Sequence, residues 1–230
     1  MKTNFKFSNC YKGLAIALIA LTSFSSCSNV DDNEIKADAY IRIVNASEGS
    51  SPQDFYLDST KLNSSAVAYT ESSAYITTTS GDRLGRFKTS GTAQVNSSAN
   101  LDIDGGKYYT VYYTGGTSSS ASFTTTADEH VKSSANKAKV RFVNLSSAMQ
   151  NKINLAIQGG AEIINDLAYK SASAYQEVDS DTNFQLFASG SSTAALALTG
   201  LNLQAGKIYT IYISGSTSLT LTYHILVDKG

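Results

Sequence analysis

The sequence predicts an all-β protein made of two tandem immunoglobulin-like antiparallel β-sandwich domains, each of about seven to eight strands. Short apolar runs rich in Tyr, Thr, Val and Ile alternate with clusters of Gly, Ser, Asn and Asp, which is the pattern of short strands joined by turns. The chain also repeats itself at a shift of about 100 residues, the size of a domain. No stretch after Cys27 keeps apolar residues on one helical face over several turns. A closed barrel is the alternative architecture.

Three pairs of segments carry the repeat. YIRIVNAS at Tyr40–Ser47 corresponds to KVRFVNLS at Lys139–Ser146, AYTESSAY at Ala68–Tyr75 to AYKSASAY at Ala168–Tyr175, and LDIDGGKYYTVYYTGG at Leu101–Gly116 to LNLQAGKIYTIYISGS at Leu201–Ser216. We therefore expect one domain at residues 39–128, a short polar linker at residues 129–137 and a second domain at residues 138–230.

The apolar runs of the first copy predict a series of strands that the second copy repeats in the same order. They are expected at Ala39–Asn45, Gln53–Asp58, Ala66–Tyr69, Ala74–Thr78, Leu84–Thr89, Ala99–Ile103, Lys107–Thr114 and Ser120–Thr126. Asn45 and Asn144 follow the first strand of each copy and are expected to form Asx turns. Ala161–Tyr169 has the best helical pattern, but its counterpart in the first copy is a poor helix.

The N-terminal residues 1–26 have the pattern of a secretory signal peptide. A lysine-rich start precedes an apolar run at Leu14–Phe24, which is too short to span a bilayer as a helix. Small residues followed by Cys27 resemble a bacterial lipobox. This resemblance implies cleavage before Cys27, lipid attachment to Cys27 and the membrane as a partner. The polar residues 27–38 that follow are expected to form a flexible acidic tether.

Three acidic residues in the tether suggest where the chain is exported. Asp31, Asp32 and Glu34 resemble the acidic surface-export signal of Bacteroidetes lipoproteins. This resemblance implies an outer-membrane lipoprotein that is surface-exposed or, failing that, faces the periplasm.

The charge and cysteine content limit the partners. Removal of residues 1–26 takes away three lysines and no acidic residue, so 18 basic residues become 15 against 19 acidic ones, a formal charge of −4. Without a basic stripe, we expect no nucleic-acid partner. Because Cys10 lies in the signal peptide, Cys27 has no partner for a disulfide in the mature chain.

The repeated Tyr-rich segment is expected to be a strand with one core face. Strand alternation places Tyr109, Val111 and their counterparts toward the core. The opposite face, with Tyr108, Tyr112 and Tyr212, is expected to border solvent. Those three rings could pair across strands or form a ligand-stacking patch for sugars, and both interpretations are open.

The residues suited to catalysis or metal binding do not recur in both copies. His130 and His224 have no histidine at the corresponding positions, and nothing resembles a nucleophile elbow. Asp102 and Asp104 could begin a calcium loop, but the second copy has Asn and Gln there. We therefore predict no metal, no cofactor and no catalytic residues, and hence no enzyme.

Two further features concern the surface. Arg42 and Arg141 lie on the strand face opposite to the one that carries the neighbouring apolar residues, and they are expected to be exposed. Asp58-Ser59-Thr60 matches a short O-glycosylation pattern described for Bacteroidetes, which marks Ser59 as a candidate modification site.

Taken together, the motifs resemble the bacterial domain-of-unknown-function 4397 family. They are a strand ending in arginine, two apolar residues and asparagine, then an AY…AY segment, and then a YT-bearing strand between glycines. The resemblance implies exported β-rich domains, often in lipoproteins and often in tandem, with no established activity.

We therefore expect a non-catalytic cell-envelope lipoprotein with a binding, adhesion or spacer role and a glycan or surface-protein ligand. The alternative is a glycan-active enzyme, or an accessory carbohydrate-binding protein of a polysaccharide-use system.

Overall fold

A computed structural model describes residues 36–115, 123–131 and 133–228. The predicted signal peptide, Cys27 and most of the tether lie outside the described residues. Within the described residues, no helix is both long and apolar enough to cross a membrane. Residues 35–230 form one compact unit. We call β1–β8 the first half of this unit and β9–β17 the second half.

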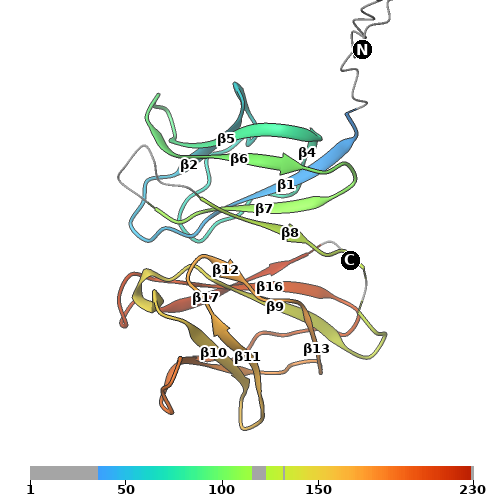
Figure 1. The fold of residues 1–230 in the computed structure, drawn as a ribbon, viewed down its shortest axis with the longest axis vertical. Coiled ribbons are helices and arrows are strands. Elements are labelled where there is room, and N and C mark those ends of the chain that lie inside the picture. Colours follow the sequence, from blue (N-terminus) through green and yellow to red (C-terminus); the bar gives the residue numbers. More distant parts are fainter. Residues whose placement is uncertain (1–35, 116–122, 132, 229–230) are drawn as a thin grey trace, which may run out of the picture. The chain divides into compact units, whose positions relative to one another are not determined.

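The first half packs two four-stranded sheets face to face (Figure 1). One sheet has the order β4 (Ile76–Thr79), β1 (Asp38–Asn45), β7 (Tyr108–Tyr113) and β8 (Thr124–Asp128). The other has the order β3 (Thr60–Lys61), β2 (Gln53–Leu57), β5 (Gly81–Thr89) and β6 (Val95–Ile103). The apolar core between them is centred on the rings of Phe55, Phe87 and Phe123, whose centroids lie 4.8–5.6 Å apart.

The second half has the same sheet order. One sheet comprises β12 (Ser171–Ala172), β9 (Ala138–Asn144), β16 (Ile208–Ser214) and β17 (Thr222–Val227), and β13 (Gln176–Val178) also pairs with β9. The other comprises β11 (Glu162–Leu167), β10 (Ile153–Ile157), β14 (Phe184–Ala188) and β15 (Ala194–Leu198). A short 3₁₀ helix, η1 (Ser147–Met149), follows β9. Phe142 and Phe184 meet edge to face in the core of this half.

The all-β prediction is confirmed, but the sheets are not purely antiparallel. In each half the first strand runs parallel to the next-to-last strand, as β1 with β7 and β9 with β16. Parallel neighbours need a long crossover connection, and here the chain passes through the opposite sheet between them. The division of the chain into two separate domains stays a prediction.

One local expectation, a strand, was wrong, and another, the Asx turns, is confirmed. Ala66–Tyr69 is not a strand, since only Val67 forms a bridge there and Thr70 has a φ of 73°. Ala161–Tyr169 is not a helix, because β11 pairs with β10 over most of it. The Asx turns form, since the Oδ1 atoms of Asn45 and Asn144 accept bonds from the backbone N–H groups of Ser47 and Ser146 at 3.1 and 3.3 Å.

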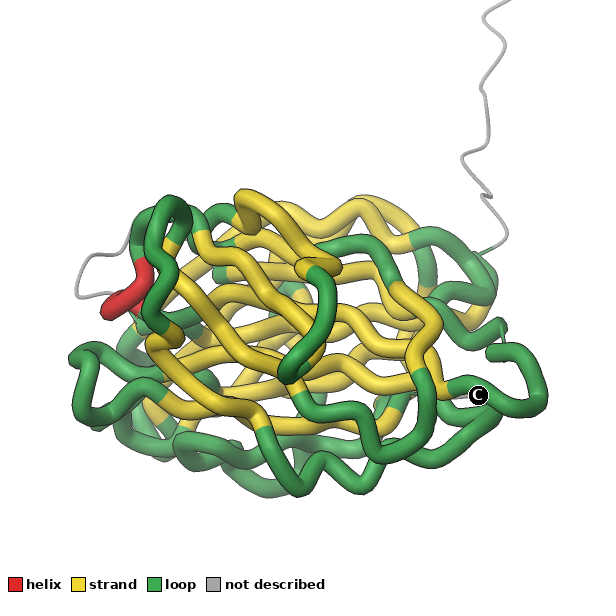
Figure 2. Tube along the Cα trace, turned by 90° about the horizontal axis from the view of Figure 1, so that it is seen from below, coloured by secondary structure: helices red, strands yellow, loops and turns green. Residues whose placement is uncertain are grey.

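Two of the four sheets face each other across the unit. We call them the facing sheets: the β1 sheet of the first half and the β9 sheet of the second half (Figure 1). Seen from below, the strands of the stacked sheets overlap (Figure 2). A third apolar cluster lies between them, with members from β1 and β7 on one side and from β9, β16 and β17 on the other. The central strands of the facing sheets are therefore buried on both faces.

Candidate functional site

The predicted ligand-stacking tyrosines lie inside the unit. Tyr112 and Tyr212 have no exposed surface, and their rings meet edge to face across the facing sheets at 6.0 Å. Tyr108 is also buried, and its ring stacks on that of Tyr40 at 4.4 Å. Burial raises the pKa of Tyr112 to about 12.

The expectation that this face of β7 borders solvent is therefore wrong, because the second half covers it. A sugar cannot stack on a ring with no exposed face, so the three tyrosines do not form the expected surface patch. Instead, Tyr112 and Tyr212 belong to the apolar cluster between the halves. The other members are Val44, Ala46, Val143, Leu145 and Leu226.

A signal for this burial is present in the sequence. β1 reads DAYIRIVN, with Ile41, Ile43 and Val44 all buried, and β16 is buried along its whole length. A strand that is apolar on both faces is typical of sheets covered on both sides. On the covered face of β7, Tyr108, Thr110 and Tyr112 do not show this apolar pattern.

Arg42 is buried rather than exposed, against expectation, with 4 % of its surface accessible. Its Nε donates to Thr110 Oγ1 in its own half at 3.0 Å. Its Nη1 donates to the carbonyl oxygen of Val227 at 3.0 Å, and its Nη2 pairs with the Asp228 carboxylate. Both of these last partners belong to the second half.

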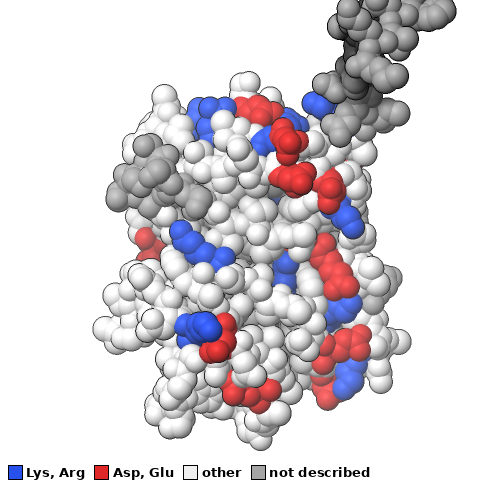
Figure 3. Space-filling view, viewed as in Figure 1, with Lys and Arg blue, Asp and Glu red and all other residues white. Residues whose placement is uncertain are grey.

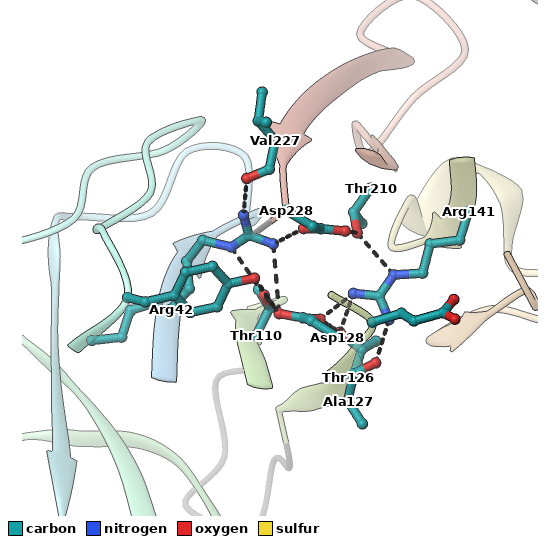
Figure 4. Close-up of polar contacts among 12 residues, drawn as sticks. Arg42, Thr110, Thr126, Ala127, Asp128, Arg141, Thr210, Val227 and Asp228 are labelled. Atoms are coloured by element: carbon teal, nitrogen blue, oxygen red, sulfur yellow. Dashed lines mark hydrogen bonds and ion pairs between the residues drawn. The ribbon is translucent and has the colours of Figure 1, made fainter. Parts of the chain in front are cut away.

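Arg141 makes the corresponding contacts in the opposite direction. It is 2 % exposed, and its Nε donates to Thr210 Oγ1 in its own half at 2.8 Å. Its Nη1 donates to the carbonyl oxygen of Ala127 at 2.7 Å, and its Nη2 pairs with the Asp128 carboxylate. Each arginine thus crosses to the aspartate at the C-terminal end of the other half's last strand, Asp128 within β8 or Asp228 directly after β17 (Figure 4).

Each aspartate is held in place by its own half. Asp128 accepts bonds from Thr110 Oγ1 at 2.5 Å and from the Tyr75 hydroxyl at 2.8 Å. Asp228 accepts the equivalent bonds, from Thr210 Oγ1 at 2.6 Å and from the Tyr175 hydroxyl at 2.8 Å. We call the eight side chains that make these contacts the interface cluster, namely Arg42, Tyr75, Thr110, Asp128, Arg141, Tyr175, Thr210 and Asp228.

The charges of the interface cluster balance. Two guanidinium groups and two carboxylates, all nearly inaccessible to water, form closely spaced pairs, as buried ions must. Burial alone would lower the pKa of Arg42, but Asp228, Tyr75 and Asp128 outweigh that effect and raise it. The guanidinium groups also lie over the rings of Tyr75 and Tyr175, at 4.7 and 4.8 Å. The cluster therefore fixes the register between the two halves.

A histidine lies near the edge of the same interface. The Nε2 atom of His224 is 3.0 Å from Ser214 Oγ, which is 3.1 Å from the Tyr69 hydroxyl of the first half. The His224 ring stacks on that of Tyr212 at 4.7 Å, and burial lowers the pKa of His224. A paired serine and histidine can act as nucleophile and base. Ser214, however, has no exposed surface, so this pair joins the halves rather than meeting a substrate.

Ser59 lies where a modification can reach it. It is exposed, in the turn between β2 and β3. The preceding Asp58 is held by Arg83 Nε at 2.5 Å and by the backbone N–H of Leu84 at 2.9 Å. The modification itself stays a prediction.

Asp102 and Asp104, which could begin a calcium loop, do not belong to a cluster of possible metal ligands. Asp102 lies in β6 and Asp104 follows it. Among the described residues, no group of three or more His, Cys, Asp or Glu side chains could hold a metal ion.

Two equivalent grooves lie outside the interface. One, of about 260 Å³, is lined by the segments Asn63–Val67 and Glu71–Ala74. The other, of about 400 Å³, is lined by Ile163–Ala168 and Ser171–Ala174, at positions shifted by about 100 residues. Both linings combine small polar side chains with apolar ones. Acidic and basic side chains are interspersed on the face shown in Figure 3, with no continuous basic patch on it.

Comparison with protein families places the chain. The model of the family described as "Domain of unknown function (DUF4397)" matches residues 39–153. The chain belongs to the DUF4397 family. The DUF4397 match includes Arg42, Asp128 and Arg141 of the interface cluster and ends before Asp228. A second tandem DUF4397 copy stays a prediction.

Other comparisons show only distant likeness for this DUF4397 protein. No curated protein matches it. One solved structure is CBMbc, a family CBM26 module of Eubacterium rectale Amy13K in complex with maltoheptaose, at 12 % identity and a TM-score of 0.27, over 84 % of this chain and 98 % of that one. Another is a candidate cell adhesion protein from Bacteroides uniformis, at 9 % identity and a TM-score of 0.22, over 86 % and 98 %.

Replacing Asp228 by Ala should lower the free energy of unfolding by about 3–5 kcal/mol, because Arg42 is then left buried without its main carboxylate. Urea denaturation of the mature chain, monitored by tyrosine fluorescence, measures the change. The matched control is Asp179→Ala, which breaks an ion pair with Lys137 at the surface and should cost less than about 1 kcal/mol. Equal stability of the two variants would contradict the buried-pair assignment.

Stability should also fall on mild acidification because of His224. Its pKa is lowered in the folded state, so below the unfolded value of about 6.5 the unfolded chain binds the proton more readily. We expect the melting temperature to drop as the pH falls from about 7.5 to about 5. The drop should be smaller in His224→Gln and unchanged in His130→Gln, whose side chain is exposed. An identical pH dependence in all three chains would refute this role.

Proposed function

We propose that this protein is a non-catalytic cell-envelope module, anchored through a lipid on Cys27, that holds its two halves as one rigid body in a spacer or adhesion role. The single observation that carries the proposal is the reciprocal pairing of Arg42 with Asp228 and of Arg141 with Asp128. These pairs are buried and connect the halves in both directions.

Rigidity follows from the cost of separating the halves. Opening the interface would expose the apolar cluster around Tyr112 and Tyr212 and break the directed bonds of both arginines. A connection made only of a flexible linker would instead let the halves reorient freely. A body of fixed length and orientation suits the display of a surface at a distance from the membrane.

The lack of catalysis is supported by the structural use of the reactive side chains. The buried aspartates and arginines pair with one another, and Ser214, which pairs with His224, has no exposed surface. A general acid or base must come within hydrogen-bond reach of its substrate, which these positions do not permit.

The site for a ligand in an adhesion role would be the two equivalent grooves. They recur in both halves, and their linings include exposed polar side chains, namely Ser64, Ser65 and Ser72 in the first half and Asn165 in the second, which can donate and accept hydrogen bonds. These groups suit a glycan or the backbone of a surface protein.

The anchor is argued from the N-terminal sequence alone. Residues 1–26 resemble a secretory signal, and the small residues before Cys27 resemble a lipobox. An acidic tether of about ten residues would then connect the lipid to the rigid body. An outer-membrane location, facing the outside or the periplasm, is part of the proposal.

Replacing Cys27 by Ala should move the protein from the membrane fraction to the soluble fraction, because the lipid would have no attachment site. Fractionation of expressing cells, with immunoblotting of both fractions, measures this. The matched control is Cys10→Ala, which removes the other cysteine of the chain and should leave the protein in the membrane fraction. Retention of the Cys27→Ala chain in membranes would rule out the anchor.

A further inference from the structure

The contacts between the halves are related by an approximate two-fold exchange. Arg42 reaches Asp228 and the carbonyl oxygen of Val227, while Arg141 reaches Asp128 and the carbonyl oxygen of Ala127. Each of these residues of the first half thus has its counterpart, about 100 positions later, in the equivalent role. An interface in which the same patch serves both partners is isologous, the kind that closes symmetric dimers.

Each half therefore carries a complete, self-complementary set of groups. The first half presents one arginine, Arg42, together with one aspartate, Asp128, that its own Thr110 and Tyr75 hold in position. The second half presents the same four residue types. A half therefore needs only two groups from its partner. One is an arginine that binds its own aspartate, and the other is an aspartate that binds its own arginine.

The centre of the interface is equally self-complementary. Tyr112 and Tyr212 are equivalent residues, and they meet each other edge to face. Val44 and Val143 are likewise equivalent members of the shared apolar cluster. Nothing at the centre requires that the two halves belong to the same chain.

We propose that this interface also forms between two copies of the chain, with the first half of one copy docked on the second half of the other. The surface is the side of each facing sheet that the other half covers, and it includes the interface cluster. The partner is a second copy, and the product is a half-exchanged dimer with two such interfaces.

The rim of the interface selects first-with-second pairing over pairing of like halves. Glu48 of the first half accepts bonds from the backbone N–H and the hydroxyl of Ser216 and from Thr220 Oγ1, at 2.7–2.8 Å. Tyr69 of the first half meets Ser214 at 3.1 Å. These contacts are preserved when halves are exchanged between chains.

The linker determines whether the interface forms within one chain or between two copies. Residues 129–137 are short enough to keep the two halves of one chain at a high effective concentration, which favours closure within the chain. A linker that prevents closure should transfer the same contacts to a second copy, the usual route to domain exchange.

The test lengthens the linker in two ways. One full-length mature chain receives six EAAAK repeats after Ser134, which form a semi-rigid helix of about 45 Å. The linker residues 129–137, fully extended, reach only about 30 Å, so this insert keeps the two halves apart. The matched control receives a Gly-Ser insert of equal length, which can fold back. Size-exclusion chromatography with light scattering gives the mass of each.

The rigid-insert chain should be dimeric at concentrations at which the flexible-insert chain is monomeric. Adding Arg42→Gln and Arg141→Gln to the rigid-insert chain should weaken the dimer at least 100-fold, because both crossed pairs are lost. A folded rigid-insert chain that stays monomeric at all concentrations, or a dimer that is indifferent to the arginine substitutions, would overturn the proposal.

A second measurement applies if the rigid insert prevents folding. Two flexible-insert chains with different affinity tags are mixed at high concentration, and one tag is used for capture. Recovery of the other tag, reduced by the two arginine substitutions, supports half exchange. Absence of the other tag, or recovery that the substitutions do not reduce, overturns it.

Discussion

The burial of two arginines against two aspartates is the constraint on which the arrangement of this protein depends. Arg42 and Arg141 are almost inaccessible to water, and each finds its carboxylate in the other half. Because an unpaired buried charge costs several kcal/mol, neither half can leave the interface without exposing its arginine or losing its partner. The reciprocal pairing therefore selects one docking geometry, while the apolar cluster around Tyr112 and Tyr212 packs between the facing sheets.

The same constraint explains the role of three repeated sequence motifs. The arginine of the first strand, the second tyrosine of the AY…AY segment and the threonine of the YT-bearing strand are Arg42, Tyr75 and Thr110 in the first half. All three converge on Asp128, with Arg42 approaching it at 3.6 Å and the other two donating hydrogen bonds to it. In this DUF4397 protein the three motifs therefore contribute to one docking surface.

The strands and the repeat could be predicted from local sequence, because alternation and turn residues are local properties. The interface could not be predicted, because Arg42 and Asp228 are 186 positions apart. The sequence around either residue does not indicate that the two are paired. Threonine and tyrosine on the outer face of β7 also have the character of an ordinary solvent-facing strand. The double-sided apolar pattern of β1 was the available signal, and its meaning depends on a partner sheet that no single strand specifies.

Calorimetry of the mature chain tests the central claim most directly. If the interface cluster makes residues 35–230 a single cooperative unit, heat unfolding should show one transition with equal calorimetric and van't Hoff enthalpies. Two resolved transitions in the unmodified chain, one for each half, would contradict the account.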